Sequence, residues 1–354
     1  MIIKENILLS DHTTIKLGGA AKYFIECDTE ESVKEALEFA KEKNCKVQTL
    51  SGGSNIIFAD HGFDGLILKI NLKGISVKKD IDDFFIYSGA GENWDEFVKY
   101  CIENELTGAE CLSGIPGSVG ATPVQNVGAY GQEVSGIIYS LKAIERESLE
   151  TRIFRIEDCR FAYRDSIFKS ECKDKFIITE VVFKMKKNSE PEIKYPELKK
   201  YIDSHKEYSG LSAGNKKLNF IRNAVISLRK KKSMVIDADD PNTISCGSFF
   251  TNPVLSVSEF EKFKNKTEAL NMLTPYYTTS DKDKIKIPAA WLVEQSGFAK
   301  GYKSKGAGIS ANHSLAIINL GGKTSDVISL SEEIIKSVKN KFGITLITEP
   351  VIIN

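Results

Sequence analysis

The spacing of apolar residues predicts surface helices in the first third of the chain. Within residues 28–44, apolar side chains recur every three or four positions and form one stripe. Asp28 followed three residues later by Glu31 is a variant of the capping box, and it predicts where this helix begins. Residues 93–106 show the same spacing, so a second helix is expected there.

A further helix is predicted near the C-terminus, over residues 325–343. Ser325 is a suitable N-cap, and Gly343 is a suitable stop because glycine readily adopts the left-handed backbone that ends helices. The apolar run 344–353 follows and is expected to be a strand.

Short apolar runs predict strands between the helices. The sequence indicates strands at 46–50, 56–58, 65–70, 84–91 and 176–185. The first two flank the turn Ser51-Gly52-Gly53-Ser54-Asn55, where bare peptide N–H groups could face an anion. Between residues 186 and 232 the apolar pattern thins and charge rises, so this stretch is expected to be a connecting excursion, with a second domain beginning near Lys232.

Composition excludes several classes of protein. The 354 residues are expected to form two or three domains. Basic and acidic residues number 48 each, so the chain has no net charge. It therefore lacks the excess of positive charge that is typical of proteins that bind nucleic acid or an anionic membrane. No apolar run is long enough for a signal sequence or a membrane span, so we expect a protein of the cytoplasm.

Cysteine and histidine give no sign of disulfides or metal. The seven cysteines are scattered and never spaced C-x-x-C, and they are interpreted as small buried residues of a reducing compartment. The four histidines form no ligand pair, so no metal is expected.

The most informative stretch is "CLSGIPGSVGATPVQNVGAYG", residues 111–131. It contains five glycines and no charged residue. Such a cluster favours positive φ angles or close approach of the main chain to a ligand. Backbone N–H groups can bind a pyrophosphate without cations, so a dinucleotide fits this segment. From the glycines alone a surface loop fits equally well.

Two familiar nucleotide signatures fail on inspection. In "GGKT", residues 321–324, the earlier glycine that a P-loop requires is replaced by Ile317. In "SGAGENW" Trp94 occupies the third glycine position of a Rossmann fingerprint, and "GAGISA" from Gly306 follows a polar run rather than a predicted strand. A dinucleotide, if bound, therefore does not use a Rossmann site.

Six motifs in order resemble one enzyme family. They are "HTTIKLGGAA", "SGGSN", "GIPGSVGATPVQNVGAYG", "CRFAYRDSIFK", "CGSFFTNP" and the near-terminal "EP". From His12 to Glu349 the chain resembles the UDP-N-acetylenolpyruvoylglucosamine reductases, also called UDP-N-acetylmuramate dehydrogenases, in the subtype whose tyrosine loop covers the substrate. Ala20-Ala21 stands where these proteins usually have glycine followed by proline, and the excursion after Tyr195 is longer than usual.

The resemblance implies an α+β fold with an FAD-binding domain of the vanillyl-alcohol oxidase/p-cresol methylhydroxylase type and a smaller α+β substrate-binding domain. The expected FAD-binding subdomains span residues 1–70 and 71–231, the second completed by the C-terminal strand 343–354. Residues 232–342 would form the substrate-binding domain.

The implied activity is NADPH-dependent reduction of a UDP-sugar. Non-covalent FAD would carry the electrons, and UDP-N-acetylenolpyruvoylglucosamine would become UDP-N-acetylmuramate in peptidoglycan synthesis. A cytoplasmic monomer without nucleic-acid or membrane partners is expected.

The chemistry of this reaction points to three residues. Reduction of an enol ether beside a carboxylate builds negative charge, so the site needs a cation at the carboxylate and an acid for the α-carbon. Arg164 offers a planar fork for the carboxylate, although outside this motif order an ion pair with Asp165 would be the simpler interpretation. Ser248 is assigned as proton donor, while Glu349 could donate a hydrogen bond if protonated or orient the arginine if ionised.

The resemblance also implies the binding residues. Contacts to FAD are expected from Ser51, Gly52, Gly53, Ser54, Asn55, Ser113, Ile115, Pro116, Gly117, Gly120, Ala121, Gln125, Asn126, Gly128 and Tyr130. Contacts to the UDP-sugar are expected from Tyr163, Tyr195, Lys232, Asn252 and Gln295.

Two other functions remain open at this stage. An oxidase on the same scaffold could hold flavin covalently through a histidine, with His61 beside the glycine turn as the candidate. A nucleotide-binding regulatory module without turnover would leave Arg164, Ser248 and Glu349 unexplained.

Overall fold

The computed structural model describes residues 1–279 and 281–354, which form two compact units. Unit 1 comprises residues 1–7, 21–53 and 63–235, and unit 2 comprises residues 8–20, 54–62 and 236–354. One passage between the units lies inside the predicted glycine turn, between Gly53 and Ser54.

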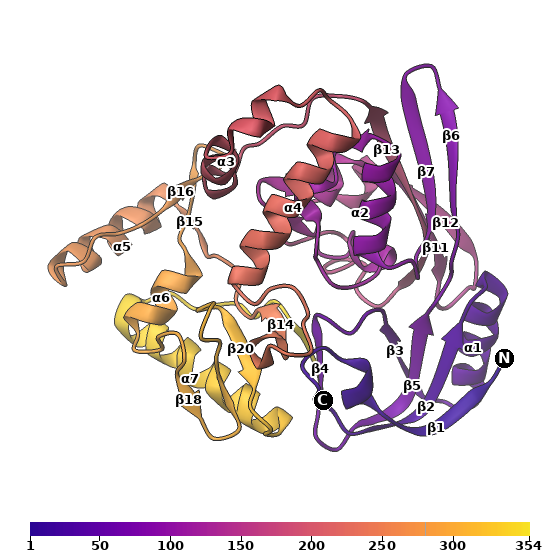
Figure 1. Ribbon diagram of the computed structural model, residues 1–354. Helices are drawn as coiled ribbons and strands as arrows, with labels where there is room; N and C mark the ends of the chain where they lie inside the picture. The colour runs from indigo at the N-terminus through magenta and orange to yellow at the C-terminus, as the bar shows by residue number, and fades with distance from the viewer. Residues whose placement is uncertain (280) are drawn as a thin grey trace. The chain divides into compact units, whose positions relative to one another are not determined.

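One sheet of unit 1 has the strand order β1-β2-β5-β3. Strand β5 runs parallel to both β2 and β3, and helix α1 packs on this sheet through its apolar stripe (Figure 1). The elements are β1 (Ile3–Leu8), β2 (Ala20–Cys27), α1 (Glu30–Glu42), β3 (Lys46–Leu50) and β5 (Phe63–Ile70).

The second sheet of unit 1 is antiparallel, with the order β12-β11-β13-β7-β6 and with β8 paired to β13. Its strands are β6 (Ile75–Asp80), β7 (Asp83–Gly89), β8 (Leu106–Thr107), β11 (Ile138–Glu145), β12 (Thr151–Arg155) and β13 (Phe176–Lys187). A separate short hairpin pairs β9 (Gly128–Ala129) with β10 (Gln132–Glu133).

Three helices of unit 1 pack together, and two of them, α2 and α4, contact the start of the glycine-rich segment. Helix α2 places Trp94 and Phe97 against Phe183 of the sheet, and α4 packs on the other side of α2 (Figure 1). The helices are α2 (Trp94–Glu103), α3 (Pro196–Asp203) and α4 (Asn215–Lys231). Single 3₁₀ turns are η2 (Glu110–Leu112), η3 (Val119–Ala121), η4 (Val134–Gly136), η5 (Ile156–Cys159) and η6 (Lys206–Gly210).

Unit 2 is built on a sheet of order β14-β20-β19-β18 and on the parallel pair β21-β4, with a smaller sheet β15-β17-β16. Helices α5, α6 and α7 share one apolar core with the first sheet. The elements are η1 (Leu9–His12), β4 (Ile56–Phe58), η7 (Pro241–Thr243), β14 (Ser245–Ser248), β15 (Val254–Ser256), α5 (Val257–Ala269), β16 (Tyr277–Thr278), β17 (Lys284–Lys286), α6 (Ala289–Gln295), β18 (Lys303–Ser304), β19 (Ala307–Ile309), β20 (Ala316–Asn319), α7 (Thr324–Phe342) and β21 (Val351–Ile353).

The predicted helices and internal strands are confirmed, but two predicted caps are wrong. The side chain of Thr29, one residue after Asp28, accepts the N–H of Ser32 and caps α1. Helix α7 begins at Thr324 and not after Ser325, because the carboxylate of Asp60 accepts the N–H groups of Thr324 and Ser325. Gly343 ends α7 with φ 79°, as predicted.

Two other stretches differ from the sequence-based prediction. The stretch 186–232 is more than a connection, because α3 and α4 enclose an apolar cluster of their own that includes Leu198, Ile221 and Val225. The predicted strand 344–353 is regular only in β21, which pairs with β4 inside unit 2. The predicted functional boundaries of the domains stay a prediction.

The glycines of the two rejected nucleotide signatures have a packing role. A Cβ atom built on Gly306 would lie 2.2 Å from Cα of Gly322. The two backbones therefore touch, and no side chain fits between them.

Candidate functional site

The glycine turn and the glycine-rich segment lie against each other in unit 1. A Cβ atom built on Gly52 would lie 2.7 Å from Cα of Gly117, and the hydroxyls of Ser51 and Ser118 share a hydrogen bond. Gly53 and Gly117 adopt φ angles of 68° and 127°, which favour glycine. The structure thus brings together two sequence segments that were predicted to bind one cofactor.

Several N–H groups at this junction are free to bind a ligand. Among residues 1–279 and 281–354, no protein atom accepts a hydrogen bond from the main-chain N–H of Gly52, Gly53 or Gly117. Lys69 lies beneath the turn, where its Nζ donates to the carbonyl of Ser51 at 2.6 Å and where burial lowers its pKa. Oriented N–H groups beside a lysine suit an anionic group such as a pyrophosphate.

Other residues of the glycine-rich segment hold it in place. The N–H of Gly120 donates to Ala90, and the buried Ser113 hydroxyl donates to the carbonyl of Glu110. Asn126 is 1% exposed; its amide donates to Glu133 and to the carbonyl of Ala162 and accepts from the N–H of Ser135. Their contacts serve the shape of the segment, and their predicted contacts to a cofactor remain a prediction.

An ion pair that the sequence did not reveal fixes the same segment from α4. The guanidinium of Arg222 donates to both carboxylate oxygens of Asp95, at 2.6 and 2.7 Å. Asp95 also accepts the N–H of Gly114, at 2.5 Å. Burial opposes ionisation, but Arg222 and the Gly114 N–H outweigh it and lower the pKa of Asp95. The acidic first turn of α2 could have been read from the sequence, but its partner lies on a helix that was not predicted.

Arg164 is presented by a tight turn that is attached to the glycine-rich segment. Its φ of 56° is unusual for a residue with a side chain, and the turn is closed by two hydrogen bonds between Ala162 and Asp165. Nη2 of Arg164 donates to the carbonyl of Gly128 at 2.7 Å, and the guanidinium lies 5.4 Å from the ring centre of Tyr163. These contacts orient the guanidinium fork.

Ser248 and Glu349 come from neighbouring backbone segments of unit 2. A bulge interrupts the pairing of β14 with β20 before Ser248, and Gly247 has a φ of 72°. Bulges of this kind redirect the next side chain. The N–H of Glu349 donates to the carbonyl of Phe249 at 2.9 Å, and the side chain of Asn55 donates to the carbonyl of Glu349 at 3.3 Å.

The thiol closest in sequence to Ser248 is not a nucleophile. Cys246 is buried, and burial raises its pKa to about 12. A thiol with that pKa stays protonated near neutral pH. All seven cysteines are free and five of them are buried, as the sequence predicted for small buried residues.

Tyr130, Tyr195 and Lys232 form a cluster in unit 1. The rings of Tyr130 and Tyr195 meet edge to face at 5.3 Å, and Nζ of Lys232 lies 5.9 Å from the centre of the Tyr130 ring. Burial raises the pKa of Tyr130 to about 12, so its hydroxyl keeps its proton. Lys232 also forms an ion pair with Glu197 at 2.6 Å.

Asn252 and Gln295 lie at the two ends of helix α6 in unit 2. The side-chain oxygen of Asn252 accepts the N–H of Ala289 at 2.8 Å, and the main-chain carbonyl of Gln295 accepts a hydrogen bond from Lys341. Helix α6 has 7 residues, so the two predicted contacts at its ends lie about 10 Å apart.

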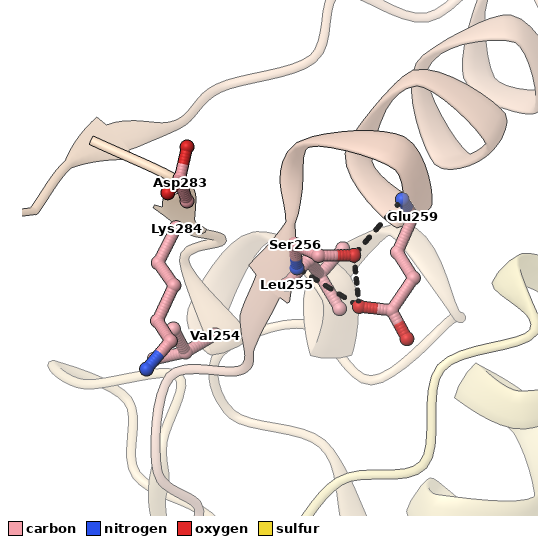
Figure 2. Close-up of a pocket in the computed structure, with 6 residues that line it drawn as sticks. All are labelled: Val254, Leu255, Ser256, Glu259, Asp283 and Lys284. Carbon is pink, nitrogen blue, oxygen red and sulfur yellow. Dashed lines mark hydrogen bonds between the residues drawn. The ribbon is translucent and has the colours of Figure 1, made fainter. Parts of the chain in front are cut away.

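A surface pocket in unit 2 contains none of the predicted site residues. Val254, Leu255, Ser256, Glu259, Asp283 and Lys284 line it. Figure 2 shows Ser256 and Glu259 joined by hydrogen bonds between their side chains and main chains, with Lys284 pointing away from them. These bonds form the capping box at the start of α5, so the acid and the serine are structural.

Two family models match the chain. Residues 21–145 match the model of the FAD binding domain, and residues 240–353 match that of the UDP-N-acetylenolpyruvoylglucosamine reductase C-terminal domain. Across the described residues, no helix combines the length and apolar character needed to cross a membrane.

Relatives that match over their full length are UDP-N-acetylenolpyruvoylglucosamine reductases. The UDP-N-acetylenolpyruvoylglucosamine reductase of Thermobifida fusca is 40% identical, over 99% of this chain and 97% of its own, and that of Flavobacterium johnsoniae is 38% identical, over 99% of both. The crystal structure of the Thermus caldophilus enzyme covers 100% of both chains with a TM-score of 0.66 and 21% identity, which shows a shared fold.

Proposed function

The chain belongs to the family of UDP-N-acetylenolpyruvoylglucosamine reductases, and from this premise we propose how its own residues carry out the reaction. It is an FAD- and NADPH-dependent oxidoreductase that converts UDP-N-acetylenolpyruvoylglucosamine to UDP-N-acetylmuramate in peptidoglycan synthesis. The observation that carries this function is identity of 36–40% to curated reductases over at least 97% of the chain. FAD, when bound, supplies the two-electron transfer from NADPH to the enolpyruvyl group.

We propose that the junction of the two glycine segments holds the FAD pyrophosphate. The N–H groups of Gly52, Gly53 and Gly117 would donate to it, and Lys69 adds positive charge below the turn. The protonated hydroxyl of Tyr130 and the amide of Gln125 would serve as polar contacts to the cofactor.

Ser248 acts as the proton donor in this proposal. Reduction adds a hydride to the β-carbon and shifts the electron pair of the double bond onto the α-carbon, so the α-carbon beside the carboxylate must receive a proton. A hydroxyl can provide it without burying another charge. Two observations support the assignment: the bulge before Ser248, where Gly247 has a φ of 72°, redirects the Ser248 side chain, and among the described residues its hydroxyl forms no hydrogen bond.

Arg164 and Glu349 stabilise the charge that develops. The guanidinium of Arg164, oriented through Gly128 and Tyr163, would bind the substrate carboxylate. Glu349 would act on the substrate from the segment paired with Phe249, directly after Ser248. The structure supports these roles through backbone placement.

The UDP part of the substrate is assigned to Lys232 and Tyr195, with Asn252, Gln295 and Tyr163 as further polar contacts. Lys232 would meet the diphosphate and Tyr195 would close over the nucleotide. We further propose that the protein works as a monomer in the cytoplasm, with FAD held non-covalently.

Stopped-flow absorbance tests the assignment of Ser248. The Ser248→Ala variant should bind FAD and be reduced by NADPH at a near-normal rate. Its reoxidation by the enolpyruvyl substrate should slow by about 10²- to 10⁴-fold, because a general acid typically contributes that factor. Ser248→Cys should recover part of the rate, since a thiol is also a neutral donor.

Reoxidation of Ser248→Ala at a near-wild-type rate would mean that water or another group supplies the proton. The proton-donor role of Ser248 would then be withdrawn, while the reductase function would stand.

A further inference from the structure

The ion pair between Glu197 and Lys232 joins the start of helix α3 to the end of α4. Glu197 Oε2 and Lys232 Nζ are 2.6 Å apart, and the two side chains are 40% and 34% exposed. Among the described residues, Glu197 is the one carboxylate within ion-pair distance of Lys232. A small anion from solution can reach both groups, because neither is buried.

Glu197 and Tyr195 belong to the same turn of the chain. Tyr195 is the N-cap of α3, Pro196 is its first residue and Glu197 lies in its first turn. Proline fixes one backbone torsion between the two residues, so Glu197 and Tyr195 are joined by a stiffened segment. Tyr195 in turn packs on Tyr130, whose ring lies beside Lys232.

The ammonium group of Lys232 cannot pair fully with both the Glu197 carboxylate and a diphosphate. A diphosphate brings more negative charge to the ammonium group than one carboxylate does, and it would be repelled by a carboxylate left 2.6 Å from the same nitrogen. Either the phosphate binds weakly, or Glu197 moves away from Lys232.

We propose that Glu197 competes with the diphosphate of the UDP-sugar for Lys232. Arrival of the diphosphate displaces the carboxylate and releases the first turn of α3 together with Tyr195, which couples diphosphate binding to movement of the tyrosine segment. Glu197 is thus a positioning residue that acts through Lys232. This inference rests on the proposed role of Lys232 in binding the diphosphate.

Calorimetric titration of the FAD-loaded protein with UDP tests the competition. Glu197→Gln removes the charge and should lower the Kd for UDP by about two- to fivefold, the range expected for a half-exposed ion pair. Glu197→Asp keeps the charge and should return the Kd toward the wild-type value. The matched control is Glu192→Gln, in the same segment, whose carboxylate pairs with Lys194 at 2.9 Å; its Kd should stay unchanged.

A double-mutant cycle separates the competition from the role of Lys232. Lys232→Met should weaken UDP binding, and in that background Glu197→Gln should have no further effect. High salt should shrink the gain of the single variant, since it screens exposed charges.

The outcomes are distinguishable. Weaker or unchanged UDP binding by Glu197→Gln, with Lys232→Met still impaired, would overturn the competition and leave Lys232 as a diphosphate ligand. Wild-type UDP binding by Lys232→Met would remove the proposed role of Lys232, and the competition with it.

Discussion

The contact between Gly52 and Gly117 shows how single residues shape the junction that is proposed to hold the cofactor. At both positions the peptide backbone itself is the contact surface, and a Cβ on Gly52 would come within 2.7 Å of the opposite main chain. The positive φ of Gly117 adds a second constraint, since residues with side chains rarely adopt 127°. The fold therefore requires glycine at these two positions, because the two backbones touch and Gly117 has a positive φ.

Gly117→Val should lower the FAD content of the purified protein, because valine rarely adopts a φ of 127° and the resulting change of backbone conformation tilts the N–H groups. Gly136→Val is the matched control: no atom lies within 4 Å of a Cβ built there, and its φ is ordinary. The readout is flavin absorbance per mole of protein. Equal flavin content in a folded Gly117→Val variant and its control would show that this junction does not hold the cofactor.

The backbone demand of the glycines was predictable from the motif. The glycines of 111–131 predict close backbone approach or positive φ, and the structure shows both at Gly117, while the ligand site and the donor role of Ser248 stay predictions. Lys69 was not predictable, because no motif distinguishes a single lysine near the end of an otherwise apolar strand. Its contact with Ser51 exists only once β5 lies beside β3.

At the level of elements, helix α7 shows how distant residues complete a local pattern. The sequence predicted its face and its glycine stop, whereas the cap comes from Asp60, more than 260 positions earlier. A prediction from local sequence considers only neighbouring side chains as caps, so it selected Ser325. The α3–α4 stretch was missed for a related reason: dense charge on the exposed sides masks the narrow stripe of buried residues on α4, which includes Leu218, Ile221 and Val225.

Asp60→Ala should destabilise the protein by about 1 kcal/mol at pH 7, the usual effect of losing an N-cap. Partial burial opposes ionisation, but hydrogen bonds from Ser325 and Thr324 outweigh it and lower the pKa of Asp60 below its ordinary 3.8. A carboxylate with a lowered pKa stabilises the fold above its unfolded-state pKa, and this contribution is lost as pH falls through the folded-state value.

Urea unfolding across this pH range measures the effect. The difference between Asp60→Ala and wild type should be full at pH 7 and shrink in acid. Asp64→Ala, which removes an exposed carboxylate paired with Lys22, should change stability by less than about 0.5 kcal/mol. A difference for Asp60→Ala that does not depend on pH would contradict capping by the ionised carboxylate.

For the whole molecule, the order of six motifs predicted the α+β fold, the family and the reaction, and the full-length relatives confirm all three. The pattern did not reveal how the chain passes between the units. Residues 8–20 and 54–62 join unit 2 although the segments around them belong to unit 1. Such passages depend on pairings like β21 with β4, which join strands almost 300 residues apart and leave no local signal.

The central claim is that this chain passes electrons from NADPH through FAD to an enolpyruvyl sugar. An anaerobic absorbance trace tests it most directly. NADPH should bleach the flavin of the purified protein, and later addition of UDP-N-acetylenolpyruvoylglucosamine should restore the colour in the same cuvette. A yellow protein that NADPH fails to bleach, or a bleached one that regains its colour with oxygen but not with the enolpyruvyl substrate, would contradict the account.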